Sequence, residues 1–200
     1  YQGLSVFYSF TTVKFRIICY FEEICKVLQR NKVYGIVKHI TQKGKIQMNS
    51  FMKIAKDCAS YGASHKEGGP FGAVITDKEG NIIAQGNNLV LKNNDPTAHA
   101  EVTVIREACK KLGTYDLSGY ILYTSCEPCP MCLSAIIWAN IKEVYYACTR
   151  EDAGKIGFRD DVIYEYLEGK QKDLIQSKQI DREECITLFE EYKKMQNTIY

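Results

Sequence analysis

Two short stretches decide how this sequence is interpreted: His99-Ala100-Glu101 and Pro128-Cys129-Pro130-Met131-Cys132. Histidine nitrogen and cysteine sulfur are the ligand atoms that zinc prefers, and a catalytic zinc site has three protein ligands and one position for water. His99, Cys129 and Cys132 therefore form a candidate zinc site for one ion per subunit. Glu101 is an acidic residue beside this site that is not needed as a ligand.

The spacing of the candidate ligands predicts that both stretches begin helices. Cys129 and Cys132 are three residues apart, so they share one face of a helix. Pro128 suits the first helical position, because a proline lacks the N–H that would be unpaired there. His99 follows Asp95, a residue type that caps helices. We expect each ligand stretch to come just after the end of a strand.

The chemistry of such a site is hydrolytic. Zinc lowers the pKa of a bound water to roughly 7, so hydroxide is available at neutral pH. Glu101 is expected to take the proton of that water, deliver it to a ring nitrogen and then protonate the departing amine. The order H-x-E…P-C-x-x-C is the signature of zinc-dependent nucleobase deaminases. The sequence therefore predicts a hydrolytic deaminase.

Two alternatives for the cysteine pair carry less weight. A redox-active C-x-x-C motif does not require a His-Ala-Glu stretch at a helix start. A structural zinc site needs a fourth protein ligand, for which Cys126 is the nearest candidate. We expect Cys126 to end a strand and face the core. The catalytic interpretation is therefore favoured over both.

Four stretches resemble bacterial guanine deaminases of the cytidine-deaminase-like superfamily. They are Gly68–Val74, Asn94–Glu101, Tyr123–Cys132 and Gly157–Asp161. The resemblance covers about residues 48–200. The zinc motif alone does not separate guanine deaminases from tRNA adenosine deaminases or from cytosine and other nucleobase deaminases, which remain the alternatives. The Gly157–Asp161 stretch and the terminal Tyr200 favour guanine.

The resemblance implies hydrolysis of guanine to xanthine and ammonia, with Glu101 as the catalytic residue and His99, Cys129 and Cys132 as zinc ligands. It also implies five substrate contacts. Asn88 would bind the purine edge, Phe71 would pack on the base and Trp138 would lie beside the pocket. Asp160 would accept hydrogen bonds from the N–H groups of guanine. Asp160 could instead be a helix cap beside Asp161, and the two acids are hard to rank for the substrate contact. Tyr200 would close the site of a neighbouring subunit in a domain-swapped homodimer.

Residues 1–47 differ in character from the remainder. They contain eight lysines and arginines against two glutamates, whereas residues 48–200 contain 18 basic and 22 acidic residues. We interpret 1–47 as an extension of doubtful origin, and the favoured explanation is translated upstream sequence. A surface-packing extension and a basic membrane-touching segment are the alternatives. We expect the deaminase domain to span 48–200 and to remain active without 1–47.

Charge and cysteine usage limit the partners. The mildly acidic domain shows no basic stripe, which argues against a nucleic-acid substrate, and no membrane contact is expected of it. The expected partners are a purine base and water. Nine cysteines, an odd count without a signal peptide, favour a reducing, cytoplasmic setting. Six of them are expected to be buried or partly buried: Cys19, Cys25, Cys58, Cys109, Cys148 and Cys185.

Apolar periodicity and turn residues predict alternating helices and strands. Helices are expected over 50–65, 98–112, 129–139, 161–169 and 183–195. Strands are expected over 73–76, 82–85, 120–124, 144–147 and 175–179, the first two as a hairpin. This alternation predicts a three-layer α/β/α domain with a mixed five-stranded sheet.

Overall fold

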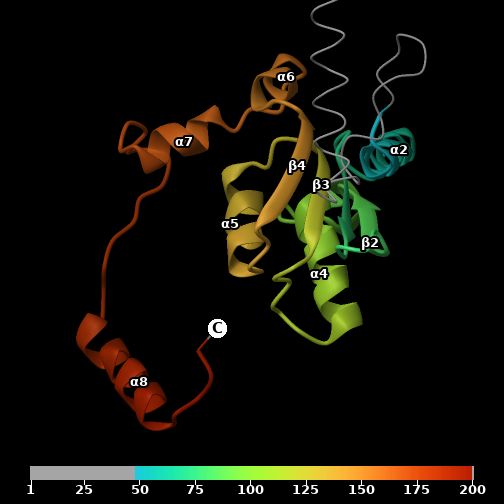
Figure 1. Cartoon of the computed structure of the whole chain (residues 1–200). Coiled ribbons are helices and arrows are strands. Elements are labelled where there is room, and N and C mark those ends of the chain that lie inside the picture. The colour runs from blue at the N-terminus through green and yellow to red at the C-terminus, as the bar shows by residue number, and fades with distance from the viewer. Residues whose placement is uncertain (1–47, 200) are drawn as a thin grey trace, which may run out of the picture. The chain divides into compact units, whose positions relative to one another are not determined.

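The computed structural model of the protein describes residues 48–199 (Figure 1). The chain divides into two units, 1–49 and 50–200, and the description below concerns the second. The expectations for residues 1–47, and the expectation for Tyr200, lie outside the described residues.

The second unit alternates helices and strands along the chain. The elements in order are α2 (Ser50–Ser64), β1 (Gly72–Thr76), β2 (Ile82–Asn87), α3 (Val90–Asn93), α4 (Ala100–Leu112), β3 (Ile121–Cys126), α5 (Pro130–Trp138), β4 (Glu143–Cys148), α6 (Arg150–Lys155), α7 (Asp161–Leu167) and α8 (Arg182–Lys194). The short helices α3 and α6 were not predicted. The α6 helix begins with a capping box, in which the Thr149 hydroxyl and the Asp152 carboxylate bind each other's backbone N–H groups.

The sheet is mixed, as predicted, with the order β2-β1-β3-β4. Strand β1 pairs antiparallel with both β2 and β3, whereas β3 and β4 are parallel. The prediction of a fifth strand over 175–179 is wrong: this segment has no strand and its residues are exposed. Only Ile175 in it is strongly apolar, so the segment has no face to bury against the domain.

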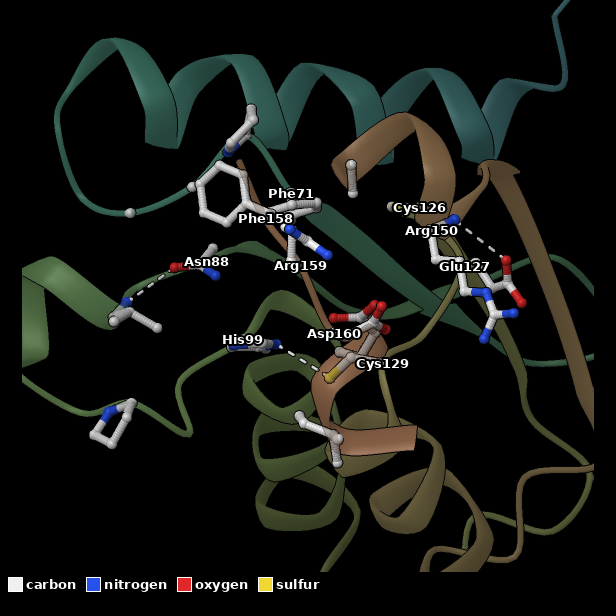
Figure 2. A pocket seen from close by; sticks show the side chains of 18 of the residues that line it. Phe71, Asn88, His99, Cys126, Glu127, Cys129, Arg150, Phe158, Arg159 and Asp160 are labelled. Atoms are coloured by element: carbon white, nitrogen blue, oxygen red, sulfur yellow. Dashed lines mark hydrogen bonds between the residues drawn. The ribbon is translucent and has the colours of Figure 1, made fainter. Parts of the chain in front are cut away.

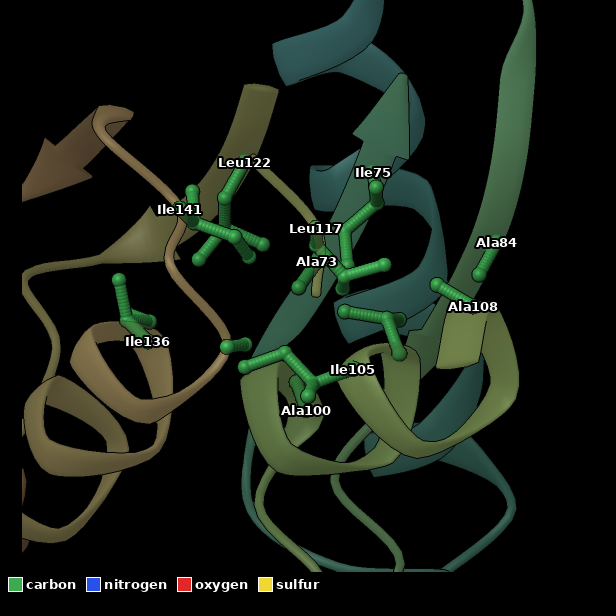
Figure 3. Close-up of a cluster of buried hydrophobic side chains, with 12 residues drawn as sticks. Ala73, Ile75, Ala84, Ala100, Ile105, Ala108, Leu117, Leu122, Ile136 and Ile141 are labelled. Atoms are coloured by element: carbon green, nitrogen blue, oxygen red, sulfur yellow. The ribbon is translucent and has the colours of Figure 1, made fainter. Parts of the chain in front are cut away.

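Helices cover both faces of the sheet, which confirms the three-layer architecture. On one face, Ala73, Ile75 and Leu122 pack with the buried side chains of α4 and α5 (Figure 3). On the other face, Val74 and Tyr123 pack against Ala55 of α2. Successive residues of β1 thus enter opposite layers, as expected for a strand buried on both sides. This packing fixes the starts of α4 and α5 against the same sheet.

The two ligand helices begin later than predicted. Pro130, not Pro128, occupies the first turn of α5, and Cys129 is its N-cap residue. His99, not Asp95, is the N-cap of α4. Asp95 instead accepts hydrogen bonds from the backbone N–H and hydroxyl of Thr97, which forms a turn before the helix. Neither His99 nor Cys129 uses its side chain to cap its helix.

The cysteine expectations are partly wrong. Cys126 is buried at the end of β3, as predicted, and Cys58 and Cys109 are half-buried. Cys148 and Cys185 are exposed, because the outer side of β4 and the whole of α8 have few buried residues. Within residues 48–199, no helix is long and apolar enough to cross a bilayer.

Candidate active site

A cavity of about 590 Å³ opens where α4 and α5 begin (Figure 2). The loop before β1, the segment after β2, the end of β3 and the stretch from α6 to α7 contribute to its wall. Three of its lining residues belong to the predicted metal-binding and catalytic set: His99, Glu101 and Cys129. Cys126, which is not in that set, also lines the cavity. The cavity therefore joins segments that are far apart in the sequence around one polar floor.

His99, Cys129 and Cys132 come together at this floor. Their ligand atoms all lie within 4.8 Å of one another. The His99 Nδ1 atom lies 3.6 Å from Cys129 Sγ and 3.5 Å from Cys132 Sγ. One nitrogen and two sulfurs at these separations fit a tetrahedral zinc ion that keeps a fourth position open. The residues present therefore fit the metal, and Cys126 is not part of the group.

Electrostatics favours thiolate at one of these sulfurs. Hydrogen bonding from Cys132, joined by His99, lowers the pKa of Cys129 to about 4. The same arrangement, together with burial, raises the pKa of Cys132. Cys129 is therefore the first of the two sulfurs to ionise, which is the state required of a metal ligand.

Glu101 lies in the first turn of α4 beside the three ligand atoms and is 5% exposed. Its Oε1 accepts a hydrogen bond from the Thr124 hydroxyl at 3.0 Å. Its Oε2 lies 3.5 Å from Cys132 Sγ. Burial raises the pKa of Glu101, which favours a carboxyl group that can both take up and release a proton during a reaction.

Comparison with known proteins places this arrangement in a family. The sequence model of the cytidine and deoxycytidylate deaminase zinc-binding region matches residues 45–148. The chain belongs to this family of zinc-dependent deaminases. A hydrolytic, zinc-dependent enzyme is what the motif predicted, and the expectation is confirmed at the level of the family.

Two relatives of known function illustrate what this deaminase is similar to. It is 57% identical to guanine deaminase of Bacillus subtilis over 119 residues. This aligned region is 60% of this chain and 76% of that protein. It is 41% identical to the tRNA-specific adenosine deaminase of Haemophilus influenzae over 90 residues. This aligned region is 45% of this chain and 52% of that protein.

Two solved structures are also similar to this chain. The crystal structure of Bacillus subtilis guanine deaminase superimposes with a TM-score of 0.71 at 47% identity, covering 76% of this chain and 99% of that chain. The protein NE0047 in complex with 2,6-diaminopurine superimposes with a TM-score of 0.52 at 29% identity, covering 75% and 83%.

Three of the predicted substrate residues line the cavity of the deaminase: Phe71, Asn88 and Asp160. Asp160 immediately precedes α7, and burial raises the pKa of its carboxyl group. Its neighbour Asp161 is half exposed and pairs with Arg159 at 2.6 Å, and it does not line the cavity. Asp160 therefore lies at the cavity and Asp161 does not, and the substrate role of Asp160 stays a prediction.

Trp138 does not join this group. It is the last residue of α5, is 68% exposed and is not one of the residues that line the cavity. Tyr200 lies outside the described residues. The roles of these two aromatic residues as substrate contacts stay predictions.

Asn88 is 3% exposed, and a hydrogen bond fixes the orientation of its side-chain carboxamide. Its Oδ1 accepts a hydrogen bond from the backbone N–H of Val90 at 3.1 Å. A backbone N–H can only donate, so it fixes which end of the carboxamide is oxygen. The Nδ2 end is turned the other way, toward the cavity (Figure 2). Asn88 thus offers donors to whatever occupies the deaminase pocket.

Sequence reasoning missed several residues of the cavity wall. Phe158 packs its ring edge-on against Phe71 with centroids 5.0 Å apart. Glu127 and Arg150 lie across from them, and the Arg150 backbone N–H donates to Glu127 Oε2 at 3.3 Å. Phe158 lies inside the Gly157–Asp161 stretch, so that stretch was the available signal. The contact of Arg150 depends on the unpredicted helix α6.

Proposed function

We propose that this deaminase hydrolyses guanine to xanthine and ammonia, with residues 48–200 as the deaminase domain. The observation that carries the proposal is the 57% identity to Bacillus subtilis guanine deaminase, together with a cavity that pairs a donor, Asn88, with an acceptor, Asp160. Guanine carries both kinds of partner, since it has a carbonyl oxygen, ring nitrogens and N–H groups.

The proposed roles follow from position. Asn88 donates from Nδ2 to an acceptor atom on the purine edge, while Asp160 accepts from substrate N–H groups. Phe71, braced by Phe158, packs on the face of the base. A pocket built around substrate hydrogen bonds rejects analogues that lack them, because the buried partner is then unpaired.

Catalysis is assigned to Glu101. Zinc held by His99, Cys129 and Cys132 would supply a water of lowered pKa and an electrophile. Glu101 takes one proton of the attacking water and delivers it to the ring nitrogen beside the carbon that is attacked. It then takes the remaining proton from the new hydroxyl group on that carbon and gives it to the leaving amine, so that the C–N bond breaks and ammonia departs. The Thr124 hydroxyl holds Oε1, while Oε2 lies 3.5 Å from Cys132 Sγ, beside the metal ligands, and is the oxygen placed for this proton transfer.

We propose a domain-swapped homodimer as the working assembly, located in the cytoplasm. Its support is that strongly apolar side chains lie exposed on the C-terminal segment and on α5 and β4. On the C-terminal segment these are Leu188, Phe189, Met195 and Ile199, and on the other surface they are Leu133, Ile137, Trp138, Tyr145 and Tyr146. Apolar patches of this kind commonly mark interfaces. In this assembly Tyr200 would reach the partner's pocket.

One assay tests the function. Zinc-loaded protein is offered guanine, cytosine, adenine, guanosine and tRNA side by side, and ammonia release is measured. We expect turnover of guanine that changes little between 50 and 200 mM salt. Turnover of tRNA alone, weakening steeply with salt as phosphate contacts require, would establish the adenosine deaminase alternative instead.

A further inference from the structure

Glu67 forms hydrogen bonds with residues on both sides of Asn88, although Glu67 itself does not line the cavity. Its Oε2 accepts a hydrogen bond from Asn87 Nδ2 at 3.0 Å. Its Oε1 pairs with Lys92 Nζ at 2.7 Å. Its backbone carbonyl accepts the N–H groups of Leu91 and Lys92 at 3.0 and 2.9 Å. One residue therefore binds the segment both before and after Asn88.

These contacts involve a charged and largely covered side chain. The Glu67 side chain is 12% exposed, and Lys92 beyond it is 57% exposed. Hydrogen bonds from Lys92 and then Asn87 lower the pKa of Glu67, so its carboxylate is ionised at neutral pH. Hydrogen bonds to an ionised acceptor are roughly twice as strong as neutral ones.

The segment held by Glu67 decides how the Asn88 carboxamide is turned. The orienting donor is the N–H of Val90, in the first turn of α3, at 3.1 Å. The Glu67 backbone carbonyl holds the N–H groups of the next two residues of α3, and its carboxylate holds the Lys92 side chain. The carboxylate contacts, which Glu67→Ala removes while the backbone contacts stay, therefore brace the helix whose first N–H orients Asn88. On the other side, Asn87 Nδ2 donates to both Glu67 Oε2 and the Asn88 carbonyl, the latter at 2.9 Å. If α3 moved, Asn88 would be free to rotate and exchange its donor for its acceptor.

The surroundings leave little room for such movement. A Cβ atom on Gly62 would lie 2.3 Å from Asn87 Nδ2. A Cβ atom on Gly68 would lie 2.1 Å from Asn88 Oδ1. Both distances are far below van der Waals contact, so these glycines let the backbone close tightly on the two asparagines. Glu67 lies between the two glycines in the sequence, and its carboxylate binds Asn87, the neighbour of Gly62.

We propose that Glu67 is a positioning residue of the pocket, which orients the Asn88 carboxamide through Asn87 and α3 without touching the substrate. The inference rests on the proposed function for the role given to Asn88. It adds a residue outside the cavity to the set that determines which edge of a base is accepted.

Kinetics of the full-length, zinc-loaded protein with guanine test the proposal through a double-mutant cycle. We expect Glu67→Ala to raise KM about tenfold, the loss of a hydrogen bond to a charged group, with kcat changed less than about threefold. The Glu67→Ala/Asn88→Ala double variant should be no worse than Asn88→Ala alone. Additive losses, or a fall in kcat with unchanged KM, would overturn the proposal.

Three further variants separate positioning from general stability. Glu67→Gln keeps an acceptor for Asn87 but loses the ion pair, so its KM should lie between those of the wild type and Glu67→Ala. Lys92→Met removes the same pair from the exposed side and should also raise KM, which keeps the test available if Glu67→Ala does not fold. Asp57→Ala removes the acid of the exposed Lys53–Asp57 pair on α2 and should leave KM unchanged.

A readout without turnover distinguishes failure of this proposal from failure of the proposed function. The side-chain NH₂ resonances of Asn88 are recorded by NMR in substrate-free, zinc-loaded protein. We expect them to shift or broaden in Glu67→Ala and to stay in place in Asp57→Ala. Unchanged Asn88 resonances in Glu67→Ala would overturn the positioning role. A wild type inert toward guanine but with the expected shifts would refute the substrate alone.

Discussion

The Thr124 hydroxyl donates a hydrogen bond to Glu101 Oε1 at 3.0 Å, and both residues are buried. Thr124 belongs to the central strand β3, while Glu101 lies in the first turn of α4. The sheet therefore holds the orientation of the acid beside the metal ligands. An ordered carboxyl group with a burial-raised pKa is suited to move a proton repeatedly along one path.

Replacing Glu101 with Gln should leave zinc bound and lower turnover by about 100- to 10,000-fold, the usual contribution of a general acid and base. The amide keeps the shape and the Thr124 contact but cannot carry the proton. Zinc content by elemental analysis and ammonia release measure the two effects. Thr124→Val is the companion variant, and its smaller expected loss is roughly 2- to 10-fold. Full activity in Glu101→Gln would remove Glu101 from the mechanism.

Substituting Cys129 with Ser should abolish stoichiometric zinc binding and activity together, because a hydroxyl is a much weaker ligand for zinc than a thiolate. The metal-to-protein ratio and ammonia release after dialysis against zinc are the measurements. Cys109→Ser is the matched control, since Cys109 is half-buried on α4 and is not part of the metal-binding group. Retention of one zinc per chain in Cys129→Ser would contradict the assigned ligand set.

Substitutions of the two neighbouring acids, Asp160 just before α7 and Asp161 in its first turn, should differ sharply in their effect on kcat/KM for guanine. Asp160→Asn replaces an acceptor at the cavity and should lower kcat/KM for guanine by roughly 10- to 150-fold, the worth of a charged hydrogen bond. Asp161→Asn weakens the exposed pair with Arg159, a residue of the cavity wall, but leaves Asp160 in place, and should change kcat/KM by no more than about twofold. The comparison uses ammonia release at several guanine concentrations. Equal losses would show that Asp160 has no special contact with the base.

Gly72→Ala should destabilise the domain by about 1–3 kcal/mol, the usual cost of overpacking a core. An added Cβ would meet the Ala55 carbonyl oxygen at 2.1 Å, where α2 crosses β1. Gly86 on the paired strand β2 is the control, since a Cβ there meets only side-chain carbons at 3.5 and 3.6 Å. Urea unfolding of both variants gives the comparison. Equal stabilities would mean that α2 can move away from the sheet at little cost.

Phe189→Glu should shift the protein from dimer to monomer. Phe189 is 72% exposed on α8, and a charge at that position would oppose burial of the helix against a partner subunit. Light scattering coupled to size exclusion measures the mass, and Glu190→Gln on the same helix is the control. A wild type that is already monomeric would contradict the proposed exchange of C-terminal segments.

Local patterns predicted most of the fold because each element carried its own signal. The period of Phe51, Ile54, Ala55 and Cys58 predicted α2, and Gly113 ended α4 where expected. The helix starts were displaced because Asp95 and Pro128 are good terminal residues by type, yet the metal-binding residues themselves occupy the N-cap positions. Residue type favours Asp95 over His99 as a cap, but the Asp95 side chain is used in the turn with Thr97, so the helix begins later.

The metal-binding group was predictable for a different reason. Its three ligands and Glu101 are encoded in two short motifs, and their meeting in space follows once both helices begin at the same end of the sheet. Glu67 had no such signal, because its contacts with Asn87 and Lys92 depend on a turn and on the unpredicted helix α3. Trp138 shows the opposite case, in which a resemblance named a residue that does not line the cavity and whose substrate role stays a prediction.

The N-cap positions of α4 and α5 carry one further consequence. A capping side chain commonly contributes about 1 kcal/mol to a helix, and both helices lack that contribution because the side chains of His99 and Cys129 are turned toward each other and toward Cys132. Occupancy by zinc then stabilises the folded chain as well as the reaction. Chelation of zinc is therefore expected to lower the melting temperature of the protein.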